Sequence, residues 1–184
     1  MKKGGIYVKL HIGCGNKYLA GYRHLDARSY PHVDYVAQAN NLNMFEDGTI
    51  EEIYACHILE HFPRKSITEV LKEWSRVLMP GGVMRIAVPD FEEITNEYQK
   101  SGDLNAVMGL LYGGQDYEYN FHFQAFDFRR LKGLLEEAGM TSVQRYRWQD
   151  FLPEGYDDFS RAYLPHMDFE HGRLMSLNVI AEKI

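Results

Sequence analysis

The chain has 184 residues, of which 45% are hydrophobic, and a formal net charge of −6 with a sequence pI near 5.7. This length predicts one domain over residues 1–184, and the acidic balance argues against a nucleic-acid binder, whose binding face would be basic. Residues 1–5 lack the features of a secretory signal, and no apolar stretch approaches membrane-spanning length. We therefore expect a cytoplasmic protein that binds neither nucleic acid nor membranes.

The first predicted strand, residues 6–12, ends in two glycines one residue apart, Gly13 and Gly15. Glycine lacks the Cβ that would keep a ligand away from the backbone, and it tolerates positive φ. The second predicted strand, residues 22–26, ends in Asp26, whose carboxylate can accept hydrogen bonds from both hydroxyls of a ribose. Together these features predict a nucleoside-bearing cofactor across the carboxyl ends of parallel strands.

The residues after the glycines distinguish between such cofactors. A dinucleotide site requires a third glycine three residues after the second, followed by a helix N-terminus that faces the pyrophosphate. This chain has Tyr18 at that position, and Gly21 follows too soon for a full helix. Asp34 stands at about the spacing of the ribose acid in an NAD site, so a nicotinamide oxidoreductase stays open as an alternative. A cofactor without a phosphate fits the missing helix better.

The rest of the chain alternates between strands and helices, which is typical of an α/β fold. Apolar periodicity predicts further strands at residues 33–36, 52–56, 82–88, 142–148 and 174–182. It predicts helices at residues 66–78, 91–100, 103–112 and 127–138, the last with Asp127 as N-cap and Gly139 as C-cap.

Two connections are unusually short for this kind of fold. Residues 16–21 and 27–32 leave no room for the helices that usually follow the first two strands. An apolar sheet face needs a cover. The shortened connections therefore predict either a homodimer formed on the under-covered face or a cover of tyrosine-rich loops within the monomer.

The segment from His57 to Asp90 completes a recognisable pattern. It reads HILEH directly after the fourth predicted strand and RVLMPGGVMRIAVPD across the next helix and strand. With GCG at residues 13–15, Asp26, and NNL at residues 40–42, this order and spacing resemble the class I S-adenosylmethionine-dependent methyltransferases. The resemblance is close over residues 6–90. From there to about residue 179 it is to a narrower group of small predicted methyltransferases of the type 11 kind.

This resemblance implies a doubly wound, Rossmann-like, mostly parallel sheet with one antiparallel strand near the C-terminus. It also implies substrate-side insertions near residues 101–126 and 149–173, and S-adenosyl-L-methionine as the cofactor. Asp26 is expected at the ribose hydroxyls. Asn41 lies where the family often carries an acid for the adenine amino group, with Gln38 as its rival, and Leu42 is expected to offer its backbone N–H and an apolar contact to the ring. The expected cofactor-binding residues are Gly13, Cys14, Gly15, Asp26, Asn41, Leu42 and His57.

Methyl transfer to a hydroxyl also requires a base, and histidine is the usual one. His122 is the first candidate, because it follows the glycine- and tyrosine-rich residues 112–120, which are expected to wall the substrate. His61 is the second candidate, and Asp158, in the insertion before the last strand, is the third. The aromatic residues expected to stack on a sugar face are Trp148, Tyr156 and Tyr163.

His57, Glu60 and His61 also form the sequence His-x-x-Glu-His, which occurs in some zinc enzymes. The segment begins on a strand end rather than within a helix, and no third ligand is apparent, so we expect no metal. Cys14 and Cys56 are expected to be free thiols in a reducing compartment.

The sequence therefore predicts a methyltransferase that uses S-adenosylmethionine and acts on a small polar acceptor. The acceptor we expect is a hydroxyl of a sugar or nucleotide-sugar, as in a surface-glycan precursor. Two other classes remain open: a cofactor-binding subunit of a larger assembly that has lost catalysis, and the nicotinamide oxidoreductase.

Overall fold

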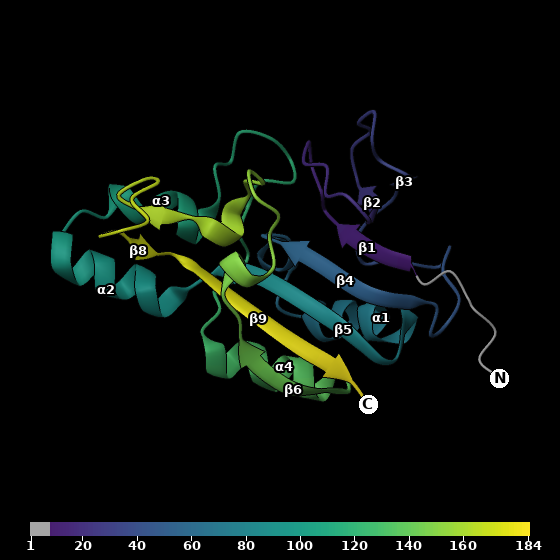
Figure 1. Cartoon of the computed structure of the whole chain (residues 1–184). Coiled ribbons are helices and arrows are strands. Elements are labelled where there is room, and N and C mark those ends of the chain that lie inside the picture. The colour runs from purple at the N-terminus through teal and green to yellow at the C-terminus, as the bar shows by residue number, and fades with distance from the viewer. Residues whose placement is uncertain (1–7) are drawn as a thin grey trace.

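A computed structural model describes residues 8–184 of the chain, and seven of the described strands form one sheet (Figure 1). From one edge to the other, the strands are β3 (Tyr35–Val36), β2 (Arg23–Asp26), β1 (Val8–Ile12), β4 (Ile50–Cys56), β5 (Leu78–Pro89), β9 (Ser176–Lys183) and β6 (Met140–Arg145). The predicted residues 6 and 7 of the first strand lie outside the described residues.

The pairing of the strands confirms the predicted architecture. The four pairs among β1 to β5 are all parallel, whereas β9 runs antiparallel to both of its neighbours, β5 and β6. The sheet is therefore the expected doubly wound, mostly parallel one with a single antiparallel strand near the C-terminus. A separate two-stranded sheet joins β7 (Tyr163–Leu164) to β8 (Arg173–Leu174).

One face of the large sheet carries the hydrophobic core. Two helices cover this face, α1 (Ile67–Val77) and α4 (Phe128–Glu137), and both lie behind the sheet in Figure 1. In α1, apolar residues recur at helical spacing and include the fully buried Leu71 and Trp74. The Asp127 carboxylate caps α4 by accepting a hydrogen bond from the Arg130 amide at 2.7 Å, as predicted.

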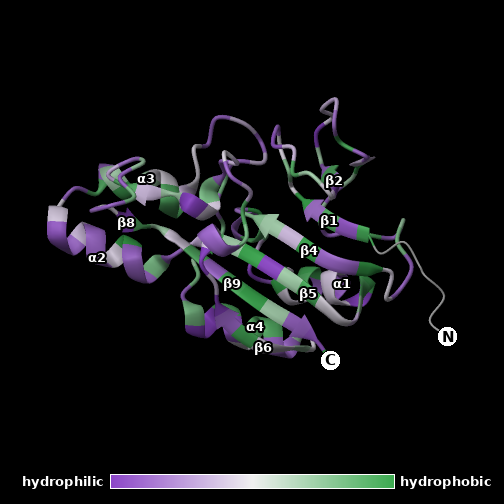
Figure 2. Cartoon of the chain, viewed as in Figure 1, coloured by the Kyte–Doolittle hydropathy of each residue, from purple (hydrophilic) through white to green (hydrophobic). Residues whose placement is uncertain are grey.

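The opposite face of the sheet is polar. Residues paired across strands lie on the same face, and the registers place Lys9 beside Glu52, and Tyr54 beside Arg85. Glu52 forms ion pairs with both Lys9 and Arg85. Figure 2 shows a hydrophilic stretch within the otherwise mostly hydrophobic β5, and Arg85 is the charged residue of this strand.

Within residues 8–184, no helix joins β1 to β2 or β2 to β3, so the predicted shortening is confirmed. The argument that an apolar sheet face would drive self-association is wrong, however, because the under-covered face carries charged and hydrogen-bonding side chains. The aromatic residues that partly cover it come from the segment after β6, where Phe151 packs on Tyr54 with ring centroids 4.8 Å apart. The homodimer stays an untested prediction.

The remaining helices lie beyond the carboxyl ends of the parallel strands (Figure 1). α2 (Phe91–Ser101) and α3 (Asn105–Tyr112) pack together around a small apolar cluster of Ile94, Val107 and Met175. Three short 3-10 turns complete the described part: η1 (Leu59–His61), η2 (Trp148–Asp150) and η3 (Phe159–Arg161). No helix among the described residues is both long and apolar enough to cross a membrane.

Candidate active site

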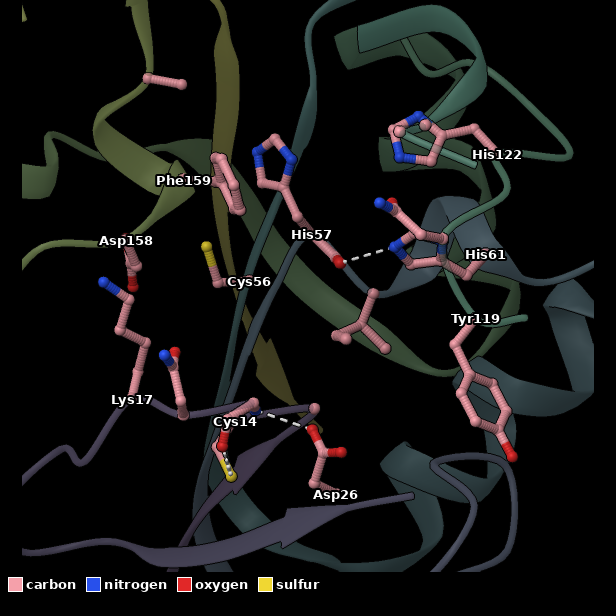
Figure 3. A pocket seen from close by; sticks show the side chains of 18 of the residues that line it. Cys14, Lys17, Asp26, Cys56, His57, His61, Tyr119, His122, Asp158 and Phe159 are labelled. Atoms are coloured by element: carbon pink, nitrogen blue, oxygen red, sulfur yellow. Dashed lines mark hydrogen bonds between the residues drawn. The ribbon is translucent and has the colours of Figure 1, made fainter. Parts of the chain in front are cut away.

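A cavity of about 860 Å³ opens at the carboxyl ends of β1, β2 and β4 (Figure 3). Its volume falls within the range of about 300–1,000 Å³ that is usual for small-molecule sites. Both predicted insertions contribute to its walls. It brings together eight of the candidate residues: Gly13, Cys14, Gly15, Asp26, His57, His61, His122 and Asp158.

The glycine turn after β1 forms the floor at one end. Gly13 and Gly15 both have positive φ, at 66° and 55°. A Cβ on Gly13 would overlap the Ile58 side chain, whereas a Cβ on Gly15 would meet only open space. The Gly13 amide donates to the Leu25 carbonyl at 2.7 Å, which holds the turn against β2. The turn therefore needs glycine for its own conformation and leaves its backbone open to a ligand.

Both cysteines are free thiols, as predicted. Burial raises the pKa of Cys14 to about 12, so its side chain in the glycine turn remains uncharged at neutral pH. Cys56 ends β4, and burial likewise raises its pKa well above the usual value. The two thiols thus contribute small, neutral surfaces to the cavity.

Asp26 ends β2 beside this turn. One carboxylate oxygen accepts the Gly15 amide at 2.7 Å, and the other accepts the Arg28 amide at 2.8 Å. Each oxygen has two lone pairs, so one on each remains for the hydroxyls of a ligand. Asp34, the alternative ribose acid, is bonded to Arg23 and to the His24 amide and does not line the cavity.

The structure corrects the prediction for Asn41 and Leu42, because neither residue lines the cavity. Leu42 is fully buried, and its amide donates to the Glu73 carboxylate at 2.9 Å, so this N–H is not free for an adenine ring. The Asn41 side chain is exposed and accepts the Asn43 amide. Gln38, the rival candidate, lines the cavity together with Ala39.

The segment after β4 brings three titratable side chains together. His57 has a φ of 52°, an uncommon conformation for a residue with a side chain, and its carbonyl oxygen lies 3.1 Å from the His61 Nε2. Its own ring lies 3.1 Å from the Ser176 hydroxyl and 3.3 Å from a Glu60 oxygen. Burial lowers the pKa of His57 to about 3 and raises that of Glu60 to about 8, so both groups are uncharged at neutral pH.

His122 joins this group from the first insertion. Its Nδ1 lies 2.9 Å from the Leu110 carbonyl, and its ring meets that of His61 edge to face, with centroids 4.9 Å apart. The Phe123 amide donates to the Glu60 carbonyl at 2.9 Å, which pins the insertion to η1. Burial lowers the pKa of His122 to about 4. The ring is therefore neutral, and the tautomer that donates from Nδ1 leaves a lone pair on Nε2.

Asp158 lines the cavity but is already committed to holding the segment that covers the polar sheet face. One of its oxygens accepts the Tyr54 hydroxyl at 2.6 Å, and the other accepts both the amide and the hydroxyl of Ser160. These bonds make Asp158 the N-cap of η3 and fix the loop to the sheet. Its geometry fits a structural role better than that of a base.

The first insertion also reaches across to the cofactor end of the cavity. The Gln38 amide donates to the Tyr119 hydroxyl at 3.3 Å, and the Arg28 guanidinium lies 4.4 Å from the centre of the Tyr117 ring. Of the three predicted stacking residues, Tyr156 and Tyr163 line the cavity, whereas Trp148 packs on Arg161 outside it.

Sequence reasoning underestimated Glu60, although the letters HILEH pointed to it. Its carboxyl group is fully buried, and neither oxygen has a hydrogen-bond partner among residues 8–184. A carboxylate flanked by two histidines in the sequence was a signal. The burial of Glu60, which leaves its oxygens without hydrogen-bond partners, could not be predicted from the sequence.

Comparison with known proteins agrees with this geometry. Residues 16–86 match the family model described as Methyltransferase domain, a segment that runs from the glycine turn into β5. No curated protein matches the chain.

Solved structures show the same fold at low sequence identity. A SAM-dependent methyltransferase from Archaeoglobus fulgidus is 16% identical with a TM-score of 0.58, over 97% of this chain and 87% of that one. The Burkholderia thailandensis 1,6-didemethyltoxoflavin-N1-methyltransferase, solved with its substrate and S-adenosylhomocysteine, is also 16% identical at a TM-score of 0.58, over 96% and 70%. A putative methyltransferase in complex with the Haloferax volcanii Trm112 activator is 12% identical at a TM-score of 0.57, over 99% and 84%. Residues 16–86 thus match a methyltransferase domain model, and over nearly its whole length the chain has the fold of these solved methyltransferases.

Proposed function

We propose that the chain binds S-adenosylmethionine at the Gly13–Gly15 turn and methylates a hydroxyl of a small polar acceptor. The acceptor class that we favour is a sugar or a nucleotide-sugar. The observation that carries the proposal is that one cavity joins the glycine turn and Asp26 at one end to the histidines at the other. A cofactor held at the first end would present its reactive group to the second.

The residues at the first end fit this cofactor. The open backbone at Gly15 leaves room for its amino-acid portion, and the free lone pairs of Asp26 suit the two ribose hydroxyls. The Gln38 side-chain oxygen is an acceptor for the adenine amino group. When bound, S-adenosylmethionine supplies a methyl group on a sulfonium sulfur, which keeps the bonding electrons as the methyl leaves. The contribution of these residues is positioning, which can account for much of the rate.

The second end removes the proton from the acceptor. His122 has its Nδ1 directed at the Leu110 carbonyl, so its Nε2 lone pair is available to take the hydroxyl proton. The O–H bond breaks as the oxygen forms its bond to the methyl carbon. His61, in edge-to-face contact with His122, supports the orientation of this ring and is the second candidate base.

The walls of the acceptor end favour a sugar. Aromatic rings there offer flat apolar faces, and polar side chains beside them can bond hydroxyl groups. The aromatic members are Phe123, Phe159 and Tyr163, and the polar members are Glu118, Asn120 and His166. Alternating flat and polar contacts of this kind suit a ring that carries several hydroxyls.

The test is transfer of tritium from S-adenosyl-[methyl-³H]methionine to panels of sugars, nucleotide-sugars, phenols and amines. The proposal predicts label in the sugar or nucleotide-sugar panel, in a product that resists the alkaline treatment that cleaves methyl esters. Label only in phenols or amines would contradict the acceptor class. Tight binding of S-adenosylhomocysteine with no transfer to any panel or to fractionated cell extract would instead favour the non-catalytic subunit.

A further inference from the structure

A buried carboxyl group without a hydrogen-bond partner lies behind the acceptor end of the cavity. Glu60 is fully buried, and neither of its oxygens accepts a hydrogen bond from the described residues. A buried polar group without a partner is costly, so its retention calls for an explanation. One oxygen has two imidazoles as neighbours: His57 Nδ1 at 3.3 Å and His122 Nε2 at 3.9 Å.

His61 completes a set of metal-ligand atoms around this carboxylate. One ligand atom each from Glu60, His61 and His122 lies within 4.8 Å of the other two. His61 and His122 face the cavity, whereas Glu60 lies behind them. The sequence argument against a metal was that His-x-x-Glu-His lacked a third ligand, and the fold brings His122 from the first insertion to that place.

The surroundings of the two histidines are those of metal-binding imidazoles. A ligand histidine usually donates its other ring N–H to a backbone carbonyl, which fixes the ring. His122 Nδ1 already lies 2.9 Å from the Leu110 carbonyl. His61 has a carbonyl 3.1 Å from each ring nitrogen, those of Phe121 and His57. A neutral imidazole has one N–H and can satisfy only one of them, so its other nitrogen is left with an unused lone pair.

We propose that Glu60, His61 and His122 bind a divalent first-row transition metal, with Zn²⁺ as the representative ion. Two imidazoles and one carboxylate form a ligand set that suits zinc or iron and leaves coordination positions open. Mg²⁺ prefers oxygen ligands and fits less well. An ion held by these three side chains would be reached from the cavity, because both histidines line it.

This inference rests on the proposed function and specifies how the acceptor is held. An acceptor hydroxyl that binds the cation becomes more acidic, as metal-bound water does. Its O–H bond then breaks and the proton leaves to water. In this form His122 holds the cation and does not itself act as the base. Neighbouring hydroxyls of a sugar would occupy two open positions at once.

The experiment titrates Zn²⁺ into metal-free, tag-free protein by calorimetry, and Co²⁺ while recording visible absorption. We expect one ion per chain, a Co²⁺ spectrum typical of nitrogen and oxygen ligands, and weaker binding in Glu60→Gln, His61→Ala and His122→Ala. Each substitution should weaken metal binding by more than about tenfold. Removing a group that only supports a ligand costs at least about that much, and removing a ligand itself should cost more. Circular dichroism identifies any variant that fails to fold. The metal affinities of the remaining variants then show whether the cluster binds the ion.

His32→Ala is the matched control. His32 lies 3.8 Å from the Cys14 sulfur, and its ring centroid is 5.2 Å from that of His24, so this group is the rival place for a metal. Binding that survives all three cluster substitutions, or that disappears in His32→Ala, overturns the inference, as does the absence of stoichiometric binding.

The outcomes also separate the inference from the proposed function. Full methyl transfer after exhaustive chelation, with no metal in the protein, overturns the metal site and leaves His122 as the base. Stoichiometric metal binding at the cluster, without transfer to any acceptor, supports the metal site and contradicts the proposed function.

Discussion

The backbone amide of Gly15 donates a 2.7 Å hydrogen bond to the carboxylate of Asp26, across the ends of β1 and β2. This bond joins the two sequence features that first pointed to a nucleoside-bearing cofactor. The glycine turn and the acid therefore form one unit, in which the acid fixes the turn and the turn orients the acid. Substitution of either Gly15 or Asp26 should therefore alter binding at the same site.

The two glycines of the turn should differ in their tolerance of a side chain. Both have positive φ, which costs an L-residue about 1–2 kcal/mol. Gly13→Ala adds an overlap with Ile58, whereas the added methyl of Gly15→Ala meets open space. We expect Gly13→Ala to lower the free energy of unfolding more than Gly15→Ala, as measured by urea denaturation. Ile58→Ala in the Gly13→Ala background should recover part of the difference, and equal losses in the two single variants would contradict this account.

Gln38, rather than Asn41, should contact the adenine. We expect Gln38→Ala to weaken S-adenosylhomocysteine binding about fivefold, since one neutral hydrogen bond contributes about 1 kcal/mol. Asn41→Ala is the matched control: it removes the same functional group three residues away, on an exposed side chain outside the cavity. Fluorescence-monitored titration of S-adenosylhomocysteine into both variants measures the two affinities. A larger loss of affinity in Asn41→Ala would support the prediction made from the sequence.

With His122 as the base, His122→Ala should retain cofactor affinity and lower kcat by about 10²- to 10⁴-fold, the usual contribution of a general base. With His122 as a metal ligand, the loss of turnover should be accompanied by loss of the bound metal. Single-turnover kinetics with a labelled methyl group would place the loss in the chemical step rather than in acceptor binding.

His61→Ala provides the comparison for His122. If His61→Ala loses turnover while His122→Ala remains active, their roles are reversed. If both variants remain active, neither histidine is the base, and Asp158 or an acceptor that needs no base takes their place.

Stability should fall as the pH is lowered from about 6.5 towards 3. Burial, together with the neighbouring His24 and His32, lowers the pKa of His11 to about 3, whereas in the unfolded chain it is about 6.5. Between these values the unfolded chain binds a proton that the folded chain does not. Each pH unit in this window therefore costs about 1.4 kcal/mol for this residue.

His11→Phe should flatten this pH dependence by about that amount per unit, because the ring can still pack on Tyr54 without titrating. His171→Ala, at an exposed residue, should leave the pH dependence of stability unchanged. Urea unfolding at pH 7 and pH 5 measures the difference, and parallel losses in wild type and His11→Phe would refute the assignment to His11.

The sequence predicted the helices closely, because their apolar residues recur at helical spacing and their ends carry caps. The helix predicted at residues 66–78 is Ile67–Val77, for example. The start of β5 was missed: Pro80-Gly81-Gly82 indicates a break, yet the strand begins at Leu78. The glycines lie within β5 at an irregularity in its pairing with β4, where the register shifts between Ile50 and Glu52 of β4.

The parts that sequence reasoning missed depend on which residues the fold brings together. The charged residues Lys9, Glu52 and Arg85 can be seen in the sequences of their strands, but their meeting on one face depends on register. Gln38 and Asn41 are three residues apart, and only the path of the backbone decides which faces the cavity. The grouping of Glu60 with His122 likewise follows from the docking of the first insertion on η1.

Calorimetric titration of S-adenosylhomocysteine into the wild-type chain and Asp26→Asn tests the central claim most directly. Asparagine keeps an oxygen for the Gly15 amide but loses the charge, and charge-assisted hydrogen bonds contribute about 1.5–3 kcal/mol. The account predicts one site per chain, binding weakened by about 10- to 100-fold in Asp26→Asn, and unchanged binding in the control Asp34→Asn, whose side chain lies outside the cavity. Absence of binding to the folded wild-type chain, or equal affinity in Asp26→Asn, would contradict it.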